Sequence, residues 1–264
     1  MKDNMNNPFY FPFGEKLKRL SQTDKSSKKI FVLGVYASAV HARWIDEKGK
    51  QLVTALAVAS EPEIFWRGEN AEEIISNIAI PKDLGKLTLP TNKNLNGPSG
   101  IALDRLFLEP LGFDRKDAWL CDLLPESRVN IYQRAAIHKF YNEDIIQKFG
   151  LNNASIPDFD KKELNCPIRR NEILNEIFES KAETIILLGD LPIYWFLRFF
   201  NNKYKRLFDF GATFSTYGNI HEIKIANKMF NVILLCHPRQ ADKLGNSNEK
   251  WWALHQNWIK SKQK

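Results

Sequence analysis

The sequence predicts an α/β fold, with three α/β/α layers around a central, largely parallel, four-stranded sheet. Short apolar runs carry this prediction, because such runs are typical of strands buried on both faces; they span 30–36, 118–124, 184–190 and 229–236. Helical patterns separate these runs, as the crossovers of a parallel sheet require. No internal repeat or low-complexity segment interrupts this order. We therefore expect a single domain over 29–264, preceded by a polar extension over 1–28.

Periodicity and capping residues place the remaining elements. A β-rich run covers 51–59, and residues 221–226 form a hairpin with the last apolar run around Asn227 and Lys228. Apolar residues at helical spacing, bounded by caps, glycines or prolines, predict helices; these cover 69–80, the segment after Ser99, 129–149, 169–180, 190–200 and 248–262. In the last helix, the spacing of Trp251, Leu254 and Trp258 favours a core face over a stacking platform.

Composition excludes several classes of protein. The chain has 264 residues, of which 44% are hydrophobic, so it can bury a sizeable core and is not disordered. Lysine and arginine number 38 against 31 acidic residues, a net charge of +7 that suits a polyanion but is also typical of a solvated face. No run approaches the roughly 20 apolar residues of a membrane span, and the signal-peptide pattern is missing. We expect a cytoplasmic protein.

The cysteines exclude further options. The chain has three, Cys121, Cys166 and Cys236, too far apart in sequence for a disulfide framework or a CxxC metal clamp. We therefore expect no metal and no cofactor.

Polar and glycine-rich turns follow the predicted strands. Ligands of open α/β sheets bind at the carboxyl ends of the strands. Turns of this kind occur at 34–38, 122–130 and 237–240, and residues 97–100 begin a helix whose free amide groups could bind a phosphate. Each turn also has an ordinary explanation, since a glycine after a strand and a single histidine are more often structural. Their order along the chain is more specific.

That order resembles the uracil-DNA glycosylase superfamily over about 29–258. Gly34 to Ser38 is similar to its first motif, and Leu235 to Pro238 resembles its second. Between these two motifs, three stretches resemble parts of the iron–sulfur branch of the superfamily. They are the glycine-rich segment 97–100, the strand end 119–122, where the family reads the base, and a Cys-Pro pair before a helix, which is followed by the segment 184–192. A cluster needs four cysteines, so the chain alone cannot hold one.

The resemblance implies recognition of a DNA base flipped out of its stack and cleavage of its N-glycosidic bond. It implies that His237 donates to a base oxygen and stabilises the leaving base. It also implies two further groups of residues, which line the base pocket (Gly34, Val35, Tyr36, Ala37, Ser38 and Trp44) and contact the DNA backbone (Gly97, Ser99, Gly100, Arg239 and Lys243). Trp44, or Phe65 and Trp66, could stack on a base, although such aromatics are more often core.

The chain departs from the family pattern at two points. The first motif, Gly34 to Ser38, has no carboxylate or amide to position water, and Asp122 stands where an asparagine reads the base. An ionised aspartate only accepts hydrogen bonds, and O4 of uracil is also an acceptor, so their mismatch would cost about 1–3 kcal/mol of binding free energy. A base edge that donates, such as the amino group of cytosine, is favoured instead. Alternatively, Asp122 is the missing catalytic carboxylate, or it caps a turn.

Three hypotheses remain open. The first is a DNA glycosylase of altered specificity in which His237 and Asp122 act. The second is a module of the same fold that binds DNA or a nucleotide without turnover. The third, an unrelated α/β hydrolase or nucleotide-binding enzyme, is disfavoured because the chain has no GxSxG, P-loop or GxGxxG motif.

Overall fold

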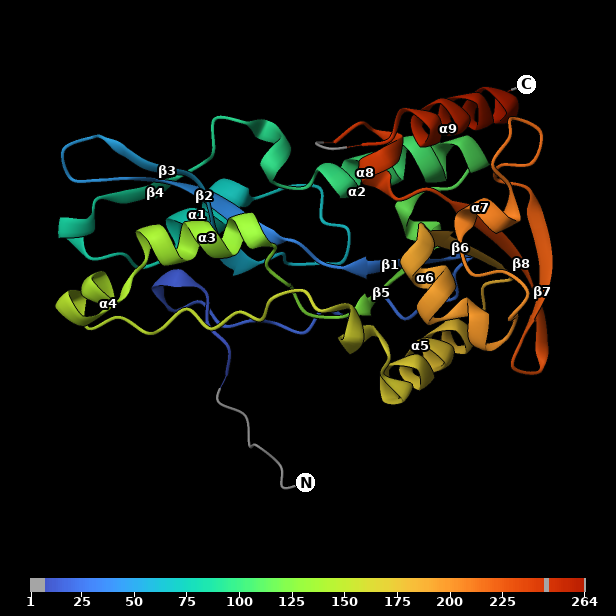
Figure 1. Cartoon of the computed structure of the whole chain (residues 1–264), viewed down its shortest axis with the longest axis horizontal. Helices are drawn as coiled ribbons and strands as arrows, with labels where there is room; N and C mark the ends of the chain where they lie inside the picture. The colour runs from blue at the N-terminus through green and yellow to red at the C-terminus, as the bar shows by residue number, and fades with distance from the viewer. Residues whose placement is uncertain (1–7, 245–246, 264) are drawn as a thin grey trace.

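A computed structural model describes residues 8–244 and 247–263. Its larger sheet has five strands in the order β5-β1-β6-β8-β7 (Figure 1). The strands are β1 (Ile30–Tyr36), β5 (Ala118–Leu124), β6 (Thr184–Leu188), β7 (Ile220–Ile225) and β8 (Lys228–Leu235). All neighbours are parallel except β7 and β8. The α/β class and the mostly parallel sheet are confirmed, but the sheet has five strands instead of four because the predicted hairpin adds β7 as an antiparallel edge.

A second sheet, which the sequence does not predict, lies at the other end of the molecule (Figure 1). It is antiparallel in the order β3-β2-β4 and consists of β2 (Ala39–Ile45), β3 (Gln51–Ser60) and β4 (Lys86–Thr88). The predicted β-rich run 51–59 is indeed a strand, β3. The chain passes from β1 directly into β2, so the two sheets meet at the first turn, Ala37–Ser38.

The helices lie around both sheets; they are α1 (Ala71–Ser76), α2 (Pro98–Leu103), α3 (Ile131–Phe140), α4 (Glu143–Phe149), α5 (Pro167–Ser180), α6 (Asp190–Trp195), α7 (Leu207–Phe210), α8 (Pro238–Ala241) and α9 (Glu249–Lys262). In Figure 1, α2, α8 and α9 cover one side of the larger sheet, and α5 and α6 cover the other. The sequence predicts a single helix over 129–149, but the structure has two, α3 and α4. The second helix begins after Asn142, whose side chain caps it by accepting the backbone N–H of Ile145. Among the described helices, none combines the length and apolar character that a membrane crossing needs.

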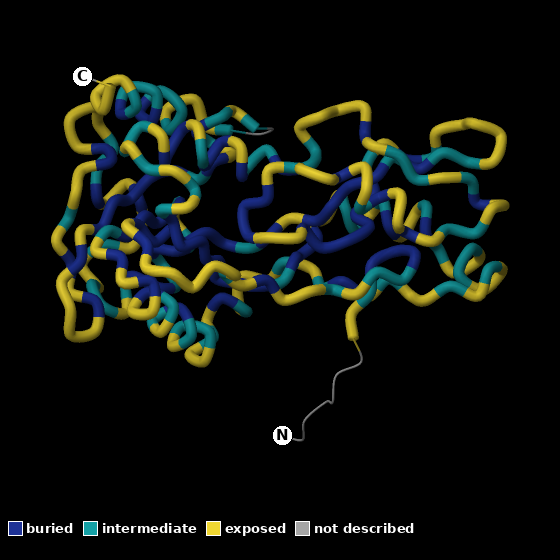
Figure 2. Tube along the Cα trace, turned by 180° about the vertical axis from the view of Figure 1, so that it is seen from behind, coloured by how far each residue is buried: buried dark blue, intermediate teal, exposed yellow. Residues whose placement is uncertain are grey.

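Each sheet has its own hydrophobic core, visible as the buried segments at both ends of the tube in Figure 2. In the larger core, Leu254 and Trp258 of α9 are buried, as their spacing predicts. In the smaller core, Phe13 packs edge-on against Trp44 at 5.1 Å between ring centroids. The stretch predicted as a polar extension is therefore part of both cores: Phe11 and Phe13 are buried in the smaller core, and Leu20 is buried in the larger one. Residues 1–7 of that prediction lie outside the described residues.

Candidate functional site

A cavity of about 800 Å³ lies where the carboxyl ends of the parallel strands face the small sheet. Three residues from separate strand ends line it: Tyr36 at the end of β1, Asp122 near the end of β5, and His237 just after β8. β5 and β8 lie on opposite sides of β1 and β6 in the sheet, and Gly34 of β1 pairs with Asp122 in register. The strand ends that the sequence predicts to meet therefore do meet.

His237 is held as a neutral hydrogen-bond donor. Its Nδ1 accepts the backbone N–H of Arg239 at 3.2 Å and thereby caps α8. Burial, with a smaller contribution from the charge of Arg239, lowers the pKa of His237 to about 4. Because Nδ1 is an acceptor, the proton of the neutral ring is on Nε2. The imidazole therefore brings an uncharged N–H group to the cavity wall.

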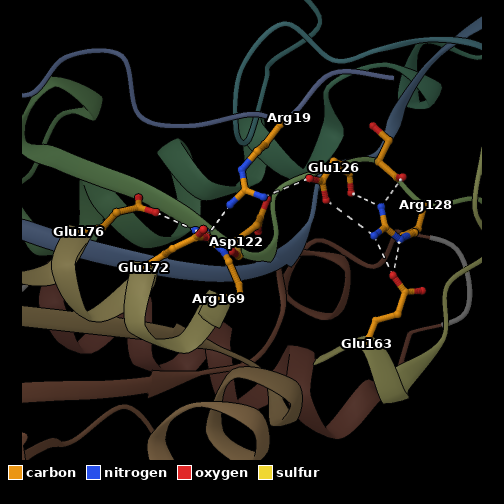
Figure 3. A network of polar contacts seen from close by, with 9 residues as sticks. Arg19, Asp122, Glu126, Arg128, Glu163, Arg169, Glu172 and Glu176 are labelled. Atoms are coloured by element: carbon orange, nitrogen blue, oxygen red, sulfur yellow. Dashed lines mark hydrogen bonds and ion pairs between the residues drawn. The ribbon is translucent and has the colours of Figure 1, made fainter. Parts of the chain in front are cut away.

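Asp122 is buried, and its backbone is anchored. Figure 3 shows Arg169 beside it, where Nη2 donates to the Asp122 carbonyl oxygen at 2.6 Å. Burial raises the pKa of the Asp122 carboxyl to about 7, although the Arg169 charge opposes this rise. Within the described part of the chain, no hydrogen bond holds the carboxyl group itself. The premise that Asp122 is ionised is therefore corrected: near pH 7 the group is about half protonated, and the protonated form both donates and accepts.

Gly34 makes room for this carboxyl and for an aromatic ring. A Cβ at Gly34 would collide with Oδ1 of Asp122 and would lie 2.6 Å from Cζ of Phe65. Phe65 lines the cavity with a φ of 53°, a region that non-glycine residues rarely occupy. Its carbonyl oxygen accepts a hydrogen bond from Arg115 Nη2 at 2.5 Å, which holds the unusual backbone in place. The Phe65 ring and the Asp122 carboxyl thus lie next to each other beside β1.

Glu61 is a cavity residue that sequence reasoning missed. Ala39 of β2 pairs with Ser60 of β3, so Glu61 lies beside Ser38 of the first motif and accepts a hydrogen bond from its backbone N–H. Burial, with an added contribution from the Asp122 charge, raises the pKa of Glu61 to about 8. The sequence offers one signal for it, an acidic residue two positions after the end of the β-rich run 51–59. A carboxyl group therefore does lie against the first motif, but it comes from the residue that follows β3.

The other residues predicted to form the site fall into two groups. Those that line the cavity are Val35, Tyr36, Ala37, Ser38, Ser99 and Arg239. Trp44 does not reach it, because its ring is fully buried in the small core and its Nε1 donates to the Leu84 carbonyl at 2.6 Å. Lys243 also lies elsewhere: it pairs with Glu249 at 3.0 Å and covers the Trp252 ring. Trp44 is therefore not available for the predicted contact with a base, whereas Lys243 lies outside the cavity lining and its contact with the DNA backbone stays a prediction.

The glycines at the start of α2 have a packing role. A Cβ at Gly97 would collide with the backbone of Arg67, and one at Gly100 would collide with the carbonyl oxygens of Phe65 and Trp66. The amide of Gly100 donates to Gly97, which leaves it less available for a phosphate. These glycines bring α2 against the Phe65 segment, whereas Ser99 faces the cavity.

His41, at the other end of the cavity, is fully engaged. Its Nδ1 lies 3.2 Å from the Leu95 carbonyl, and its Nε2 lies 2.8 Å from Nε2 of Gln133. Nδ1 therefore donates and Nε2 accepts, so this ring has a structural role and His237 is the histidine that brings a free N–H to the cavity. Over residues 8–244 and 247–263, no cluster of three or more His, Cys, Asp or Glu side chains is arranged to hold a metal ion.

Comparisons with known proteins do not assign a family. The sequence matches no protein-family model and no curated protein. The chemistry of the cavity is therefore the observation from which a function can be inferred.

Proposed function

We propose that the cavity binds a nucleobase of DNA and that the protein cleaves the N-glycosidic bond of that base, with the fold of the uracil-DNA glycosylase superfamily. One observation carries the proposal: an uncharged imidazole N–H from His237, the Asp122 carboxyl and the Phe65 ring line one cavity at the ends of parallel strands. A planar heterocycle with polar edges is the ligand that this set suits, because a ring face stacks on an aromatic and the edges take hydrogen bonds.

In this proposal Asp122 reads the edge of the base. Uracil offers an acceptor at O4 and a donor at N3, and a protonated carboxyl pairs with both as an asparagine amide does. The pKa of about 7 makes this form available at and below neutral pH. Uracil is therefore disfavoured only at alkaline pH, where the ionised carboxylate opposes O4.

His237 and Glu61 serve the bond cleavage. When the C–N bond breaks, its electron pair moves to the base, and the N–H of His237 stabilises the negative charge that develops there. The sugar becomes cationic and is attacked by water, whose proton a carboxylate accepts. Glu61 is our candidate for this carboxylate, since it lies against the first motif, which lacks one. The positive sugar favours the ionised form of Glu61.

One observation favours a second candidate function, binding without turnover. With a pKa of about 8, Glu61 is mostly protonated at neutral pH and is then a poor base. Binding without base release at every pH from 7 to 9 would indicate the non-catalytic module, and release that increases toward pH 9 would indicate the enzyme.

The test is an excision assay with single-stranded and duplex oligonucleotides that carry uracil, hypoxanthine, xanthine or a modified cytosine. We expect release of at least one base by the wild type and loss of that release in His237→Ala and Glu61→Gln. His138→Ala is the matched control, because His138 is exposed on α3 and away from the cavity walls. Full release by His237→Ala, or equal loss in His138→Ala, would contradict the assignment.

A further inference from the structure

The cavity is larger than one base needs. At the volume of liquid water, about 30 Å³ per molecule, its volume of about 800 Å³ equals on the order of 25 waters, and a single pyrimidine would fill only a small part of it. Beyond the base site, the cavity continues between the small sheet and α3, where Val53 and Ala55 of β3 face Tyr132, Gln133 and Ala136. We call this part the second compartment and define it by these five residues.

Tyr132 is the aromatic residue among the five that define the second compartment. It lies in the first turn of α3 and is 78% exposed, although it also lines the cavity. Asn130 holds this turn by accepting the amide of Tyr132 at 2.9 Å. The ring is thus an exposed aromatic on a fixed backbone, in contact with the same cavity as Asp122 and His237. Aromatic rings in such positions stack on the bases of single strands with little sequence preference.

The charge of the cavity walls argues against a duplex. Among the described residues that line the cavity, Arg239 is the one lysine or arginine. Proteins that bind duplex DNA neutralise many phosphates with such residues, whereas two linked nucleotides share a single bridging phosphate. Arg239 lies at the base-site end, close enough to Tyr36 and His237 to alter their pKa values. The single positive charge of Arg239 near the base site therefore suits the single phosphate that links two nucleotides.

We propose that the second compartment binds the nucleotide next to the target nucleotide, with its base stacked on Tyr132, so that the cavity takes two consecutive nucleotides of single-stranded nucleic acid. This inference rests on the proposed function, because it assumes that the base site holds the first of the two bases. It adds a substrate class, the single strand, and a specificity residue outside the motifs.

The experiment compares the binding of deoxyuridine monophosphate, a deoxyuridine-containing dinucleotide and a short duplex by the full chain at pH 6. We expect the dinucleotide to bind more tightly than the mononucleotide and than the duplex. Tyr132→Ala should weaken dinucleotide binding by about 5- to 150-fold, the equivalent of 1–3 kcal/mol of stacking, and leave mononucleotide binding unchanged. Tyr132→Phe should retain most of the affinity. Phe214→Ala is the control, since Phe214 is 64% exposed and lies outside the cavity lining.

Each outcome separates the two proposals. Equal affinity for mononucleotide and dinucleotide, no effect of Tyr132→Ala, or preference for the duplex overturns the second compartment and leaves the proposed base site standing. If neither nucleotide binds, both proposals fail. If Tyr132→Ala weakens dinucleotide binding but no assay detects base release, the second compartment is supported and only the cleavage step is rejected.

Discussion

The buried carboxyl of Asp122 should make the protein less stable as the pH rises. Its folded pKa of about 7 lies above the ordinary value of 3.8, because burial disfavours the charged form more than Arg169 favours it. Below pH 4 the group is protonated in both the folded and the unfolded chain and has no effect. As the pH rises above 4, the unfolded chain ionises first, so stability is lost until the pH passes 7.

The size of this loss follows from the pKa difference. At 1.36 kcal/mol per pKa unit, a rise from 3.8 to about 7 corresponds to a penalty of about 4 kcal/mol above pH 7. Asp122→Asn keeps the shape of the side chain and removes the ionisation. Relative to the wild type, the variant should therefore gain up to about 4 kcal/mol of unfolding free energy between pH 4 and pH 8.

Urea denaturation of both proteins at pH 5, 7 and 9 measures this difference. Glu47→Gln is the matched control, because Glu47 is an exposed carboxyl in the turn between β2 and β3. We expect the gain of Asp122→Asn over the wild type to grow with pH and that of Glu47→Gln to stay constant. A difference for Asp122→Asn that does not change with pH would refute the argument that burial controls this carboxyl.

Three further predictions concern the same site. Gly34→Ala should lower stability by about 1–3 kcal/mol and abolish base binding, because the new methyl group displaces Asp122 and Phe65; denaturation and ligand titration would show both effects. Arg169→Gln should raise the pKa of Asp122 by about one unit, measurable from the carboxyl carbon by NMR, since it removes the charge that opposes burial. Uracil affinity should fall about tenfold between pH 6 and pH 9 in the wild type and stay constant in Asp122→Asn; a constant wild-type affinity would contradict base reading by the protonated acid.

The larger sheet was predictable because its inner strands are buried on both faces. Ile30 to Leu33 and Ile185 to Leu188 are fully buried, and a continuous apolar run is the sequence pattern of such strands. The same pattern placed the strand ends, and with them Tyr36, Asp122 and His237. The edge strand β7 was predicted as a hairpin arm, but its membership of the sheet depends on pairing with β8.

The small sheet and Glu61 were not predictable from local patterns. β4 has only three residues, and β2 is buried through packing against Phe13 and its neighbours, which are distant in sequence. Trp44 was assigned to the pocket because it follows the first turn, yet the direction of its side chain is decided by this core. Glu61 joins the site because β3 pairs back onto β2, and a single sequence carries no signal for that register.

In the proposed function, the two buried carboxyls would link base recognition to proton transfer. The charge of Asp122 contributes to the raised pKa of Glu61, so the protonation of one depends on that of the other. A bound base whose edge carries an acceptor favours the protonated form of Asp122. Because this form is uncharged, Glu61 no longer has a negative charge beside it. The pKa of Glu61 then falls, and the carboxylate that accepts a proton from water becomes more populated when the correct base is bound. If the proposed function holds, Asp122 would contribute to specificity in two ways, through its hydrogen bonds to the base and through its effect on the ionisation of Glu61.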